Sequence, residues 1–218
     1  QRRASGAEPV ASLRSVTCRL GRALAVRNVS LEVFPGETVA VLGPNGSGKT
    51  TLLKTMAGLI TPTVGTVVGG GMKIGRSHVA ARGIVGYAGH HPHHYGDLTV
   101  SENLAFVGDI FLVDDPIPRI ERLTFDLGIA SYRESRAREL SRGLQQRLAL
   151  AIALLPSPRL LLLDEPEAAL DAASREKLKW IFDTYAADAG IIFATHDLAG
   201  ASELADHAVV LNRGLLAG

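Results

Sequence analysis

The sequence predicts an α/β protein built around a parallel β-sheet. Short apolar runs at residues 38–42 and 160–163 have the length of buried parallel strands, and each leads into a loop. Segments with helical patterning follow these runs, so strands alternate with helices at both ends of the chain, and a mainly helical insertion lies between. This alternation is typical of a parallel sheet whose strands are joined by crossover helices.

The N-terminal half begins with strands and then becomes helical. The segment "LAVRNVSLEVFPGETVAVLG" predicts strands that end at a glycine loop, and residues 50–59 predict a helix. The segment "TVGTVVGGGMKIG" predicts short strands joined by glycine turns. Thr99 and Glu102 then have the spacing of a capping box before an apolar run. Pro118 suits the first position of a second helix.

The C-terminal half repeats the alternation of strands and helices. Ser141 is a suitable N-cap for a long helix that runs through residue 155. A helix is also expected at residues 175–185. Strands are expected at residues 160–163, 190–195 and 207–211.

The composition indicates one globular domain. The chain has 218 residues, of which 46% are hydrophobic and 21% charged, and its net charge of +1 gives no bias toward nucleic acid. Its single cysteine, Cys18, can form no internal disulfide. No apolar run reaches the roughly 18–20 residues of a membrane helix, and "QRRASGAEPVAS" lacks the apolar core of a signal peptide. We therefore expect a flexible tail at 1–10 and one domain at 11–218, with a helical subdomain at about 89–150.

The most specific motif is "GPNGSGKTT", which has the G-x-x-x-x-G-K-[ST] spacing of a phosphate-binding loop between a strand and a helix. The glycines let several backbone N–H groups point at one phosphate chain, and the following helix adds its positive end. The lysine supplies a charge for the β- and γ-phosphates, and the first threonine hydroxyl can ligate Mg²⁺. The expected nucleotide-binding residues are Gly43, Pro44, Asn45, Gly46, Ser47, Gly48, Lys49, Thr50 and Thr51.

Two further motifs supply the groups that phosphate chemistry needs. In "RLLLLDEP", Asp164 stands at the C-terminal end of a predicted strand, where it is expected to hold Mg²⁺, partly through water. Glu165 is expected to polarise the attacking water. In "IIFATHD", His196 follows another apolar strand and is expected to contact the γ-phosphate. A surface acidic pair and a purely structural histidine are the alternatives.

Four segments in this order resemble the nucleotide-binding subunit of ABC transporters: "GPNGSGKTT", "ELSRGLQQRLALAIALL", "LLLLDEPEAALD" and "FATHD". The resemblance covers about residues 10–218. It implies an ABC-type ATPase domain of the P-loop NTPase class, with a parallel sheet core, a small antiparallel β subdomain and a helical subdomain. It also implies ATP and Mg²⁺ as ligands, a transmembrane permease as partner, and a cytoplasmic location, peripheral on the inner face of the cell membrane.

The segment "LSRGLQQR" separates this family from other P-loop ATPases. In the family, this signature lies at a helix N-terminus and completes the nucleotide site of the opposite subunit. The resemblance therefore implies an ATP-dependent, head-to-tail homodimer. Asp171, in "AALD", falls where the family has a loop that communicates between the two sites. The signature residues expected at the partner's nucleotide are Ser141, Arg142, Gly143 and Leu144.

The sequence departs from the family pattern at three places. Arg142 and Leu144 replace a glycine and a glutamine of the usual LSGGQ. Leu20 stands where the family often stacks an aromatic ring on adenine. We therefore expect weaker selectivity for adenine over guanine.

A cluster of histidines occurs in "GYAGHHPHHYG". His90 falls where the family has a glutamine that touches Mg²⁺ and the attacking water, and it is expected to replace that glutamine. Adjacent residues in a loop seldom converge on one point, so a metal or haem site is not expected here. His91, His93 and His94 are instead expected to form a solvated loop that faces a membrane partner.

The "GH" of this segment, together with the "LSRG-x-QQR" signature, resembles the ATP-binding subunit of the haem exporter of cytochrome c maturation. That resemblance implies haem export or haem handling in cytochrome c biogenesis. The alternative within transport is a prokaryotic ABC exporter or importer with another substrate.

Two other classes of protein remain open. ABC ATPases of DNA repair or translation usually carry two cassettes or a long coiled-coil insertion, whereas this chain has one cassette and no basic patch for nucleic acid. A P-loop kinase would need a lid that binds the phosphate acceptor and would not explain "LSRGLQQR". No nucleic acid partner is expected.

Overall fold

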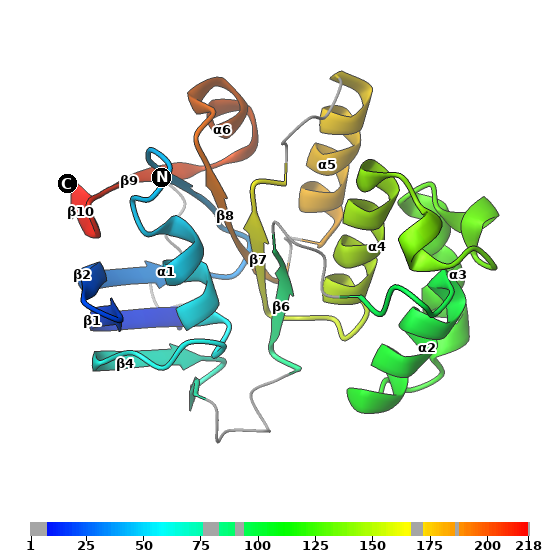
Figure 1. Cartoon of the computed structure of the whole chain (residues 1–218), viewed down its shortest axis with the longest axis horizontal. Helices are drawn as coiled ribbons and strands as arrows, with labels where there is room; N and C mark the ends of the chain where they lie inside the picture. Colours follow the sequence, from blue (N-terminus) through cyan, green and yellow to red (C-terminus); the bar gives the residue numbers. More distant parts are fainter. Residues whose placement is uncertain (1–7, 76–82, 90–93, 167–171, 186–187, 218) are drawn as a thin grey trace.

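The computed structural model describes residues 8–75, 83–89, 94–166, 172–185 and 188–217, which form two β-sheets and the helices around them (Figure 1). The strands are β1 (Ala11–Leu20), β2 (Ala23–Val33), β3 (Thr38–Leu42), β4 (Val64–Gly69), β5 (Met72–Lys73), β6 (Val85–Ala88), β7 (Leu160–Asp164), β8 (Gly190–Thr195), β9 (His207–Asn212) and β10 (Leu215–Ala217). The helices are α1 (Lys49–Met56), α2 (Val100–Ile110), α3 (Pro116–Asp126), α4 (Arg142–Leu154), α5 (Ala172–Tyr185) and α6 (Leu198–Leu204), with short 3₁₀ turns at Ala130–Tyr132 and Ala137–Glu139.

The larger sheet has the strand order β10-β9-β3-β8-β7-β6 and is parallel except for its edge strand β10, which runs antiparallel to β9. The smaller sheet is antiparallel, with the order β2-β1-β4-β5. In Figure 1 the smaller sheet and α1 lie on one side of the parallel strands, and α2, α3 and α4 lie on the other. This arrangement confirms the predicted α/β fold with an antiparallel β subdomain.

The parallel strands are apolar because both of their faces are buried. Along β3, Ala40 and Leu42 pack into a core with α4 and α5, whereas Val39 and Val41 pack into a second core with α1 and the antiparallel sheet. Successive side chains of a strand point to opposite faces, so a strand between two cores needs apolar residues at every position. The uninterrupted apolar runs in the sequence reflect this double burial.

The helix caps predicted from local sequence form as expected. Thr99 and Glu102 make a reciprocal capping box at the start of α2. The Ser141 hydroxyl accepts from the Leu144 N–H at 3.4 Å and caps α4. Both caps satisfy N–H groups that have no partner within the helix.

Several element boundaries differ from the prediction. α1 ends at Met56 and not at residue 59, because Gly58 takes a left-handed conformation (φ +73°) and closes the last turn with a bond from its N–H to the Thr55 carbonyl. α3 begins at Pro116, two residues before the proline expected to start it. α5 begins at Ala172, before the expected residue 175.

Strand β6 was not predicted, and neither were α6 and β10. The sequence of β6, "VGYA", is short and contains a glycine that weakens any strand pattern. A Cβ on Gly86 would lie 2.2 Å from the Ala153 carbonyl of α4, so the close approach of this helix requires glycine here. The boundaries expected for the N-terminal tail and the helical subdomain remain predictions.

Among the helices of the described part of the chain, none is both long enough and apolar enough to cross a bilayer.

The buried side chain of Asn103 ties the segment before α2 to the helix. Its amide oxygen accepts from the Tyr95 N–H at 2.8 Å, and its amide nitrogen contacts the carbonyls of Tyr95, Leu98 and Thr99 at 3.0, 3.2 and 2.9 Å. Asn103 therefore holds the segment that follows the histidine cluster to α2, together with Phe106, whose ring meets the Tyr95 ring edge-on at a centroid distance of 5.1 Å.

We expect Asn103→Ala to lower the free energy of unfolding by about 2–3 kcal/mol, because it removes a buried side chain and leaves several part-buried backbone groups without this partner. Thermal unfolding should then shift by roughly 5–10 °C. The matched control is Asn212→Ala on exposed β9, which should change stability by less than about 0.5 kcal/mol. Equal stability of the two variants would contradict the role given to Asn103.

Candidate functional site

The register of three parallel strands brings the predicted motifs to one edge of the larger sheet. Leu42 at the end of β3 pairs with Thr195 of β8, and Ala194 of β8 pairs with Asp164 at the end of β7. The phosphate-binding loop after β3, Glu165 after β7 and the histidine after β8 therefore start side by side. Ligands bind at this carboxyl edge in open α/β sheets.

The phosphate-binding loop is enclosed by two neighbouring strands. Gly48 has φ +109°, and a Cβ on it would lie 2.1 Å from the Ala25 carbonyl of β2. A Cβ on Gly43 would lie 2.2 Å from the Leu211 carbonyl of β9. Glycine is needed at both positions because backbone from β2 and β9 packs directly against the loop.

Lys49 lies inside the loop and is only 6% exposed. Its ammonium donates to the Gly43 carbonyl at 2.7 Å and to the Pro44 carbonyl at 3.2 Å. Pro44, Asn45 and Gly46 are exposed, as is Thr50 at the start of α1. A buried charge with an accessible loop above it suits the binding of an anionic group.

Two other residues of the motif are buried. Ser47 and Thr51 are both nearly inaccessible to solvent. The Ser47 carbonyl accepts from the Gly214 N–H at 2.9 Å, so the turn between β9 and β10 also fixes the loop. This contact could not be predicted from the sequence, because the turn lies more than 160 residues away from the loop along the chain.

The acidic pair separates into a buried and a more accessible carboxylate. Asp164 is 4% exposed at the end of β7. Oε1 of Glu165 lies 3.2 Å from Nδ1 of His196, at hydrogen-bond distance. The structure therefore brings together the two residues that were predicted to act on water and on the γ-phosphate. The carboxylate can accept a proton, and the imidazole orients it.

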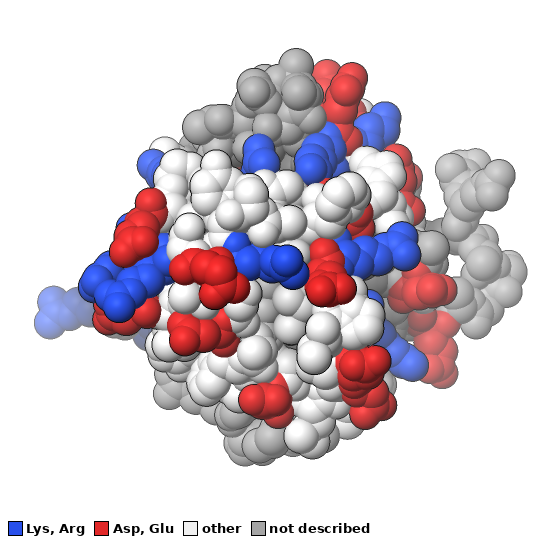
Figure 2. Space-filling model, turned by 90° about the vertical axis from the view of Figure 1, so that its right-hand side faces the viewer, with Lys and Arg blue, Asp and Glu red and all other residues white. Residues whose placement is uncertain are grey.

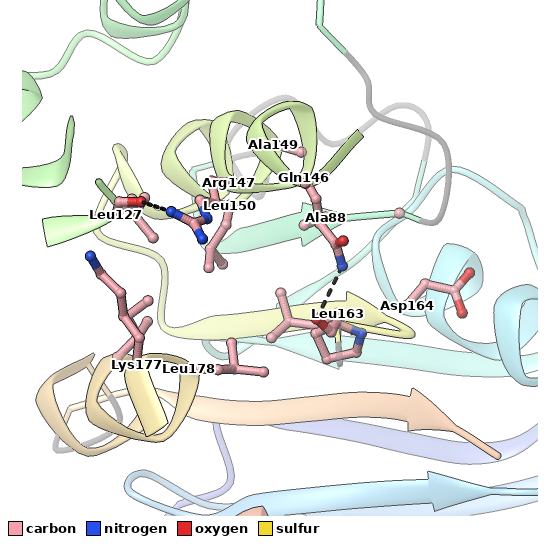
Figure 3. Close-up of a pocket in the computed structure, with 14 residues that line it drawn as sticks. Ala88, Leu127, Gln146, Arg147, Ala149, Leu150, Leu163, Asp164, Lys177 and Leu178 are labelled. Atoms are coloured by element: carbon pink, nitrogen blue, oxygen red, sulfur yellow. Dashed lines mark hydrogen bonds between the residues drawn. The ribbon is translucent and has the colours of Figure 1, made fainter. Parts of the chain in front are cut away.

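The donor set at this edge fits Mg²⁺. Mg²⁺ prefers oxygen ligands and is usually held by one or two carboxylates and by phosphates, with water completing the shell. Asp164 offers a carboxylate that points toward α1 (Figure 3), and Thr50 offers an exposed hydroxyl at the start of that helix. When bound, the ion would neutralise charge on phosphate oxygens.

Tyr87 of β6 is a further group of this region that sequence reasoning did not identify. Burial, and secondly the negative charge of Asp164, raises the pKa of Tyr87 well above its usual range. Both effects favour the neutral phenol over the phenolate. Its place beside Asp164 depends on the pairing of β6 with β7, which the sequence did not reveal.

The signature residues lie at the start of α4. Ser141, Arg142 and Gly143 are exposed, and Leu144 is partly buried. A Cβ on Gly143 would meet nothing within 4 Å, so packing within the chain does not require glycine there. The expected contact of these residues with the nucleotide of a second copy remains a prediction.

Two of the predicted site residues, His90 and Asp171, lie outside the described residues, as do His91 and His93. His94 is partly buried, and burial lowers its pKa, so this histidine is less solvated than expected. Within the described ranges, no group of three or more His, Cys, Asp or Glu side chains is placed to hold a metal ion.

Gln146 of α4 also reaches the carboxyl edge of the larger sheet, although the sequence did not single it out. Its amide nitrogen donates to the Pro166 carbonyl at 3.0 Å and lies 3.4 Å from the Glu165 carbonyl. The neighbouring Gln145 donates instead to the Ala137 carbonyl at 3.1 Å. Helical periodicity separates these two glutamines onto different faces, but only the packing of α4 decides which face meets β7.

Comparison with known proteins identifies a matching family. The sequence pattern described as ABC transporter matches residues 26–168. A solved structure described as the ATP-binding subunit of an ABC transporter superimposes with a TM-score of 0.89 at 26% sequence identity, over 96% of this chain and 88% of the other.

Curated relatives agree with this match. A sulfate/thiosulfate import ATP-binding protein, CysA, of Caulobacter vibrioides is 39% identical over 211 residues, which are 93% of this chain and 62% of that protein. A probable sulfate/thiosulfate import ATP-binding protein, CysA, of Chlorella vulgaris is 37% identical over 206 residues, which are 93% of this chain and 87% of that protein. The chain thus spans about three fifths of the length of the Caulobacter protein.

We expect Gly48→Ala to abolish nucleotide binding and to destabilise the fold by at least about 2 kcal/mol, because the new methyl group would overlap the Ala25 carbonyl. Gly71→Ala is the matched control, since Gly71 also has a positive φ (+78°) but has nothing within 4 Å of an added Cβ. The control should cost about 1–2 kcal/mol of backbone strain and keep nucleotide affinity. Titration with a fluorescent ATP analogue and thermal unfolding measure the two effects, and unchanged affinity in Gly48→Ala would contradict the packing argument.

Proposed function

This chain belongs to the ABC transporter family, and we propose that it is the subunit that hydrolyses ATP to energise a separate membrane permease. The observation that carries the proposal is the convergence at one sheet edge of a buried lysine in a phosphate-binding loop, a buried aspartate, and a glutamate within 3.2 Å of a histidine. Each group matches one requirement of phosphoryl transfer to water.

The geometry supports a mechanism in which positioning and electrostatics do most of the chemistry. The loop N–H groups and Lys49 bind the phosphates of ATP, and Thr50 and Asp164 would hold Mg²⁺, which would neutralise charge on the phosphate oxygens. Glu165 accepts the proton of the attacking water, while His196 orients that carboxylate and contacts the γ-phosphate. The γ-phosphate leaves as inorganic phosphate. Transfer to a second substrate would instead indicate a kinase.

A second copy of the chain completes the site in this proposal. The exposed Ser141 and Gly143 lie at the N-terminus of α4, a favourable place for an anion. Gly143 has open space around it, so its lack of a side chain leaves room for an external group to approach closely. ATP binding would close a head-to-tail dimer, and hydrolysis would reopen it.

The segment α2–α3 is the proposed contact with the permease. Leu112, Ile117 and Phe125 are exposed by 85%, 66% and 76%, which is unusual for large apolar side chains in one short region. Figure 2 shows acidic and basic side chains interspersed on this side of the molecule, with uncharged areas between them. A mixed surface of this kind favours a protein partner over nucleic acid. Contact with a permease through this surface would place the chain peripherally at a membrane.

The most specific part of the proposal is the identity of the transported substrate. Haem export was the reading suggested by two short motifs, but the relatives reported above are named for sulfate/thiosulfate import. They favour the alternative, a prokaryotic transporter with another substrate, and we propose an importer of a small oxyanion such as sulfate. The chain itself has no role in selecting that substrate in this proposal, because the permease forms the translocation path.

We expect Glu165→Gln to keep ATP binding but to slow hydrolysis by about 10²–10⁴-fold, because the amide cannot accept a proton from water. The rate of inorganic phosphate release measures the effect. Glu203→Gln, an exposed carboxylate of α6, is the control and should keep the wild-type rate. Normal turnover in Glu165→Gln would remove Glu165 from the mechanism.

The Glu165→Gln variant also tests which membrane protein is the partner. Tagged Glu165→Gln with Mg·ATP should capture a membrane permease from native membranes, because the closed dimer persists. A captured permease of the sulfate-import type, with sulfate-stimulated ATPase activity in liposomes, would support the oxyanion proposal. A haem-handling partner with a Soret band would overturn it in favour of haem export. Failure to capture any permease would overturn the transport role itself.

Leu20 gives a prediction about nucleotide selectivity. It ends β1 and pairs with Ala23, two residues before the Ala25 that contacts the phosphate-binding loop. An aliphatic side chain stacks poorly on a base, so ATP and GTP should be hydrolysed at comparable rates. Leu20→Tyr should bind ATP about fivefold more tightly, since base–aromatic stacking is worth about 1–3 kcal/mol. A strong preference for ATP in the wild type would contradict this expectation.

Leu59→Tyr is the matched control for this substitution, because Leu59 and Leu20 are both 47% exposed and Leu59 lies beyond the far end of α1. Equilibrium titration with labelled ATP should show no gain for Leu59→Tyr. An equal gain in ATP affinity in both variants would show that the effect comes from nonspecific stacking.

A further inference from the structure

Glu165 has a backbone conformation that it would not adopt by itself. Its φ is +55°, in the left-handed region that disfavours side chains with a Cβ. It also precedes Pro166, and the proline ring further restricts the residue before it to extended conformations. Such a conformation persists only where surrounding contacts impose it. The contacts that hold this residue therefore also hold its carboxylate.

Two groups of contacts restrain the backbone here, and they come from different parts of the fold. The Glu165 N–H donates to the Ala194 carbonyl at 2.9 Å, which extends the ladder between β7 and β8. On the other side, the amide nitrogen of Gln146 donates to the Pro166 carbonyl at 3.0 Å and lies 3.4 Å from the Glu165 carbonyl. The first restraint belongs to the sheet, and the second belongs to α4.

Gln146 reaches β7 along the edge of a cavity. Figure 3 shows its side chain extending from α4 toward the end of β7. The cavity has a volume of about 60 Å³, and its lining includes Gly143 of α4, Asp164 of β7 and the apolar side chains of Leu150, Leu163 and Leu178. A hydrogen bond beside apolar groups is weakened little by competing water.

The same helix carries the signature. Gly143 and Gln146 are three residues apart, about one helical turn, and both line this cavity. Any shift of α4 relative to the sheet must therefore move the donor of the bond to Pro166. The Glu165 side chain would respond, because its pairing with His196 depends on the same backbone.

We propose that Gln146 is a positioning residue for Glu165: by bonding the Glu165–Pro166 backbone, it holds the carboxylate beside His196 and links the signature helix to the hydrolytic step. The proposal rests on the ATP hydrolysis proposed above. It assigns Gln146 no contact with nucleotide or water. Its effect should therefore fall on the rate of the chemical step and leave nucleotide binding intact.

The test compares Gln146→Ala and Gln146→Glu with Gln145→Ala. The glutamate variant keeps the length of the side chain but cannot donate as a carboxylate. We expect kcat for ATP to fall by about 10- to 100-fold in both Gln146 variants, the loss typical of a misplaced catalytic group, with KM within about twofold of the wild type. Gln145→Ala is the control, because Gln145 donates to Ala137 and not to the catalytic edge. Its kcat should match the wild type.

A double variant separates positioning from general damage. If Gln146 acts through Glu165, then adding Gln146→Ala to Glu165→Gln should lower the residual rate by less than about twofold. A merely structural role would instead multiply the two losses and weaken nucleotide affinity as well. The proposal would be overturned if the two losses in rate multiply in the double variant, or if kcat is unchanged in the single Gln146 variants.

A crystal structure of Gln146→Ala gives a readout that does not depend on activity. Glu165 should leave its positive φ and lose the contact between its Oε1 and Nδ1 of His196. Retention of both features would overturn the proposal even if the rate fell. A wild-type protein that releases no phosphate from ATP would sink the proposed function, whereas normal wild-type turnover with a fully active Gln146→Ala variant would sink only the role of Gln146.

Discussion

The parallel ladders that join β3 to β8 and β8 to β7 place Leu42 beside Thr195 and Asp164 beside Ala194. Every group of the proposed mechanism follows from this register, because each functional loop begins where one of these strands ends. Side chains alternate along a strand with a period of two, so a slip by one residue would turn Asp164 to the other face and reverse the buried faces of the sheet. The two apolar cores on either side therefore fix the chemistry as well as the fold.

The remaining elements hold the loops that this register aligns. Backbone of β2, β9 and the β9–β10 turn packs against the phosphate-binding loop. A side chain at Gly48 or Gly43 would overlap a carbonyl group of β2 or β9. On the other side of the parallel strands, α4 reaches the end of β7 through Gln146. Backbone contacts thus surround the phosphate-binding loop, whereas the start of α4 meets the end of β7 through Gln146 beside a small cavity, and buried residues farther along α4 pack into the core with β7.

Family membership and substrate have different physical bases. The described groups of the proposed ATPase site lie within this chain, so the family match over residues 26–168 and the geometry support each other. The substrate of a transporter with a separate permease contacts other chains. For that reason the short histidine-rich and signature motifs carry little information about the substrate, and the relatives reported above are named for sulfate/thiosulfate import and not for haem export. His90 and Asp171 lie outside the described residues and remain predictions.

The sequence by itself determined the features whose partners lie within a few residues. The phosphate-binding loop, the Thr99–Glu102 capping box and the Ser141 cap are local, so residue type and spacing predicted them. Apolar runs likewise predicted the buried strands. Only the tertiary structure decided contacts between distant segments, such as Glu165 with His196, 31 residues apart. The pairing of β6 with β7 and the bond from Gln146 to Pro166 are also decided by the tertiary structure. Both depend on segments that are distant in the sequence and not on the neighbouring residues.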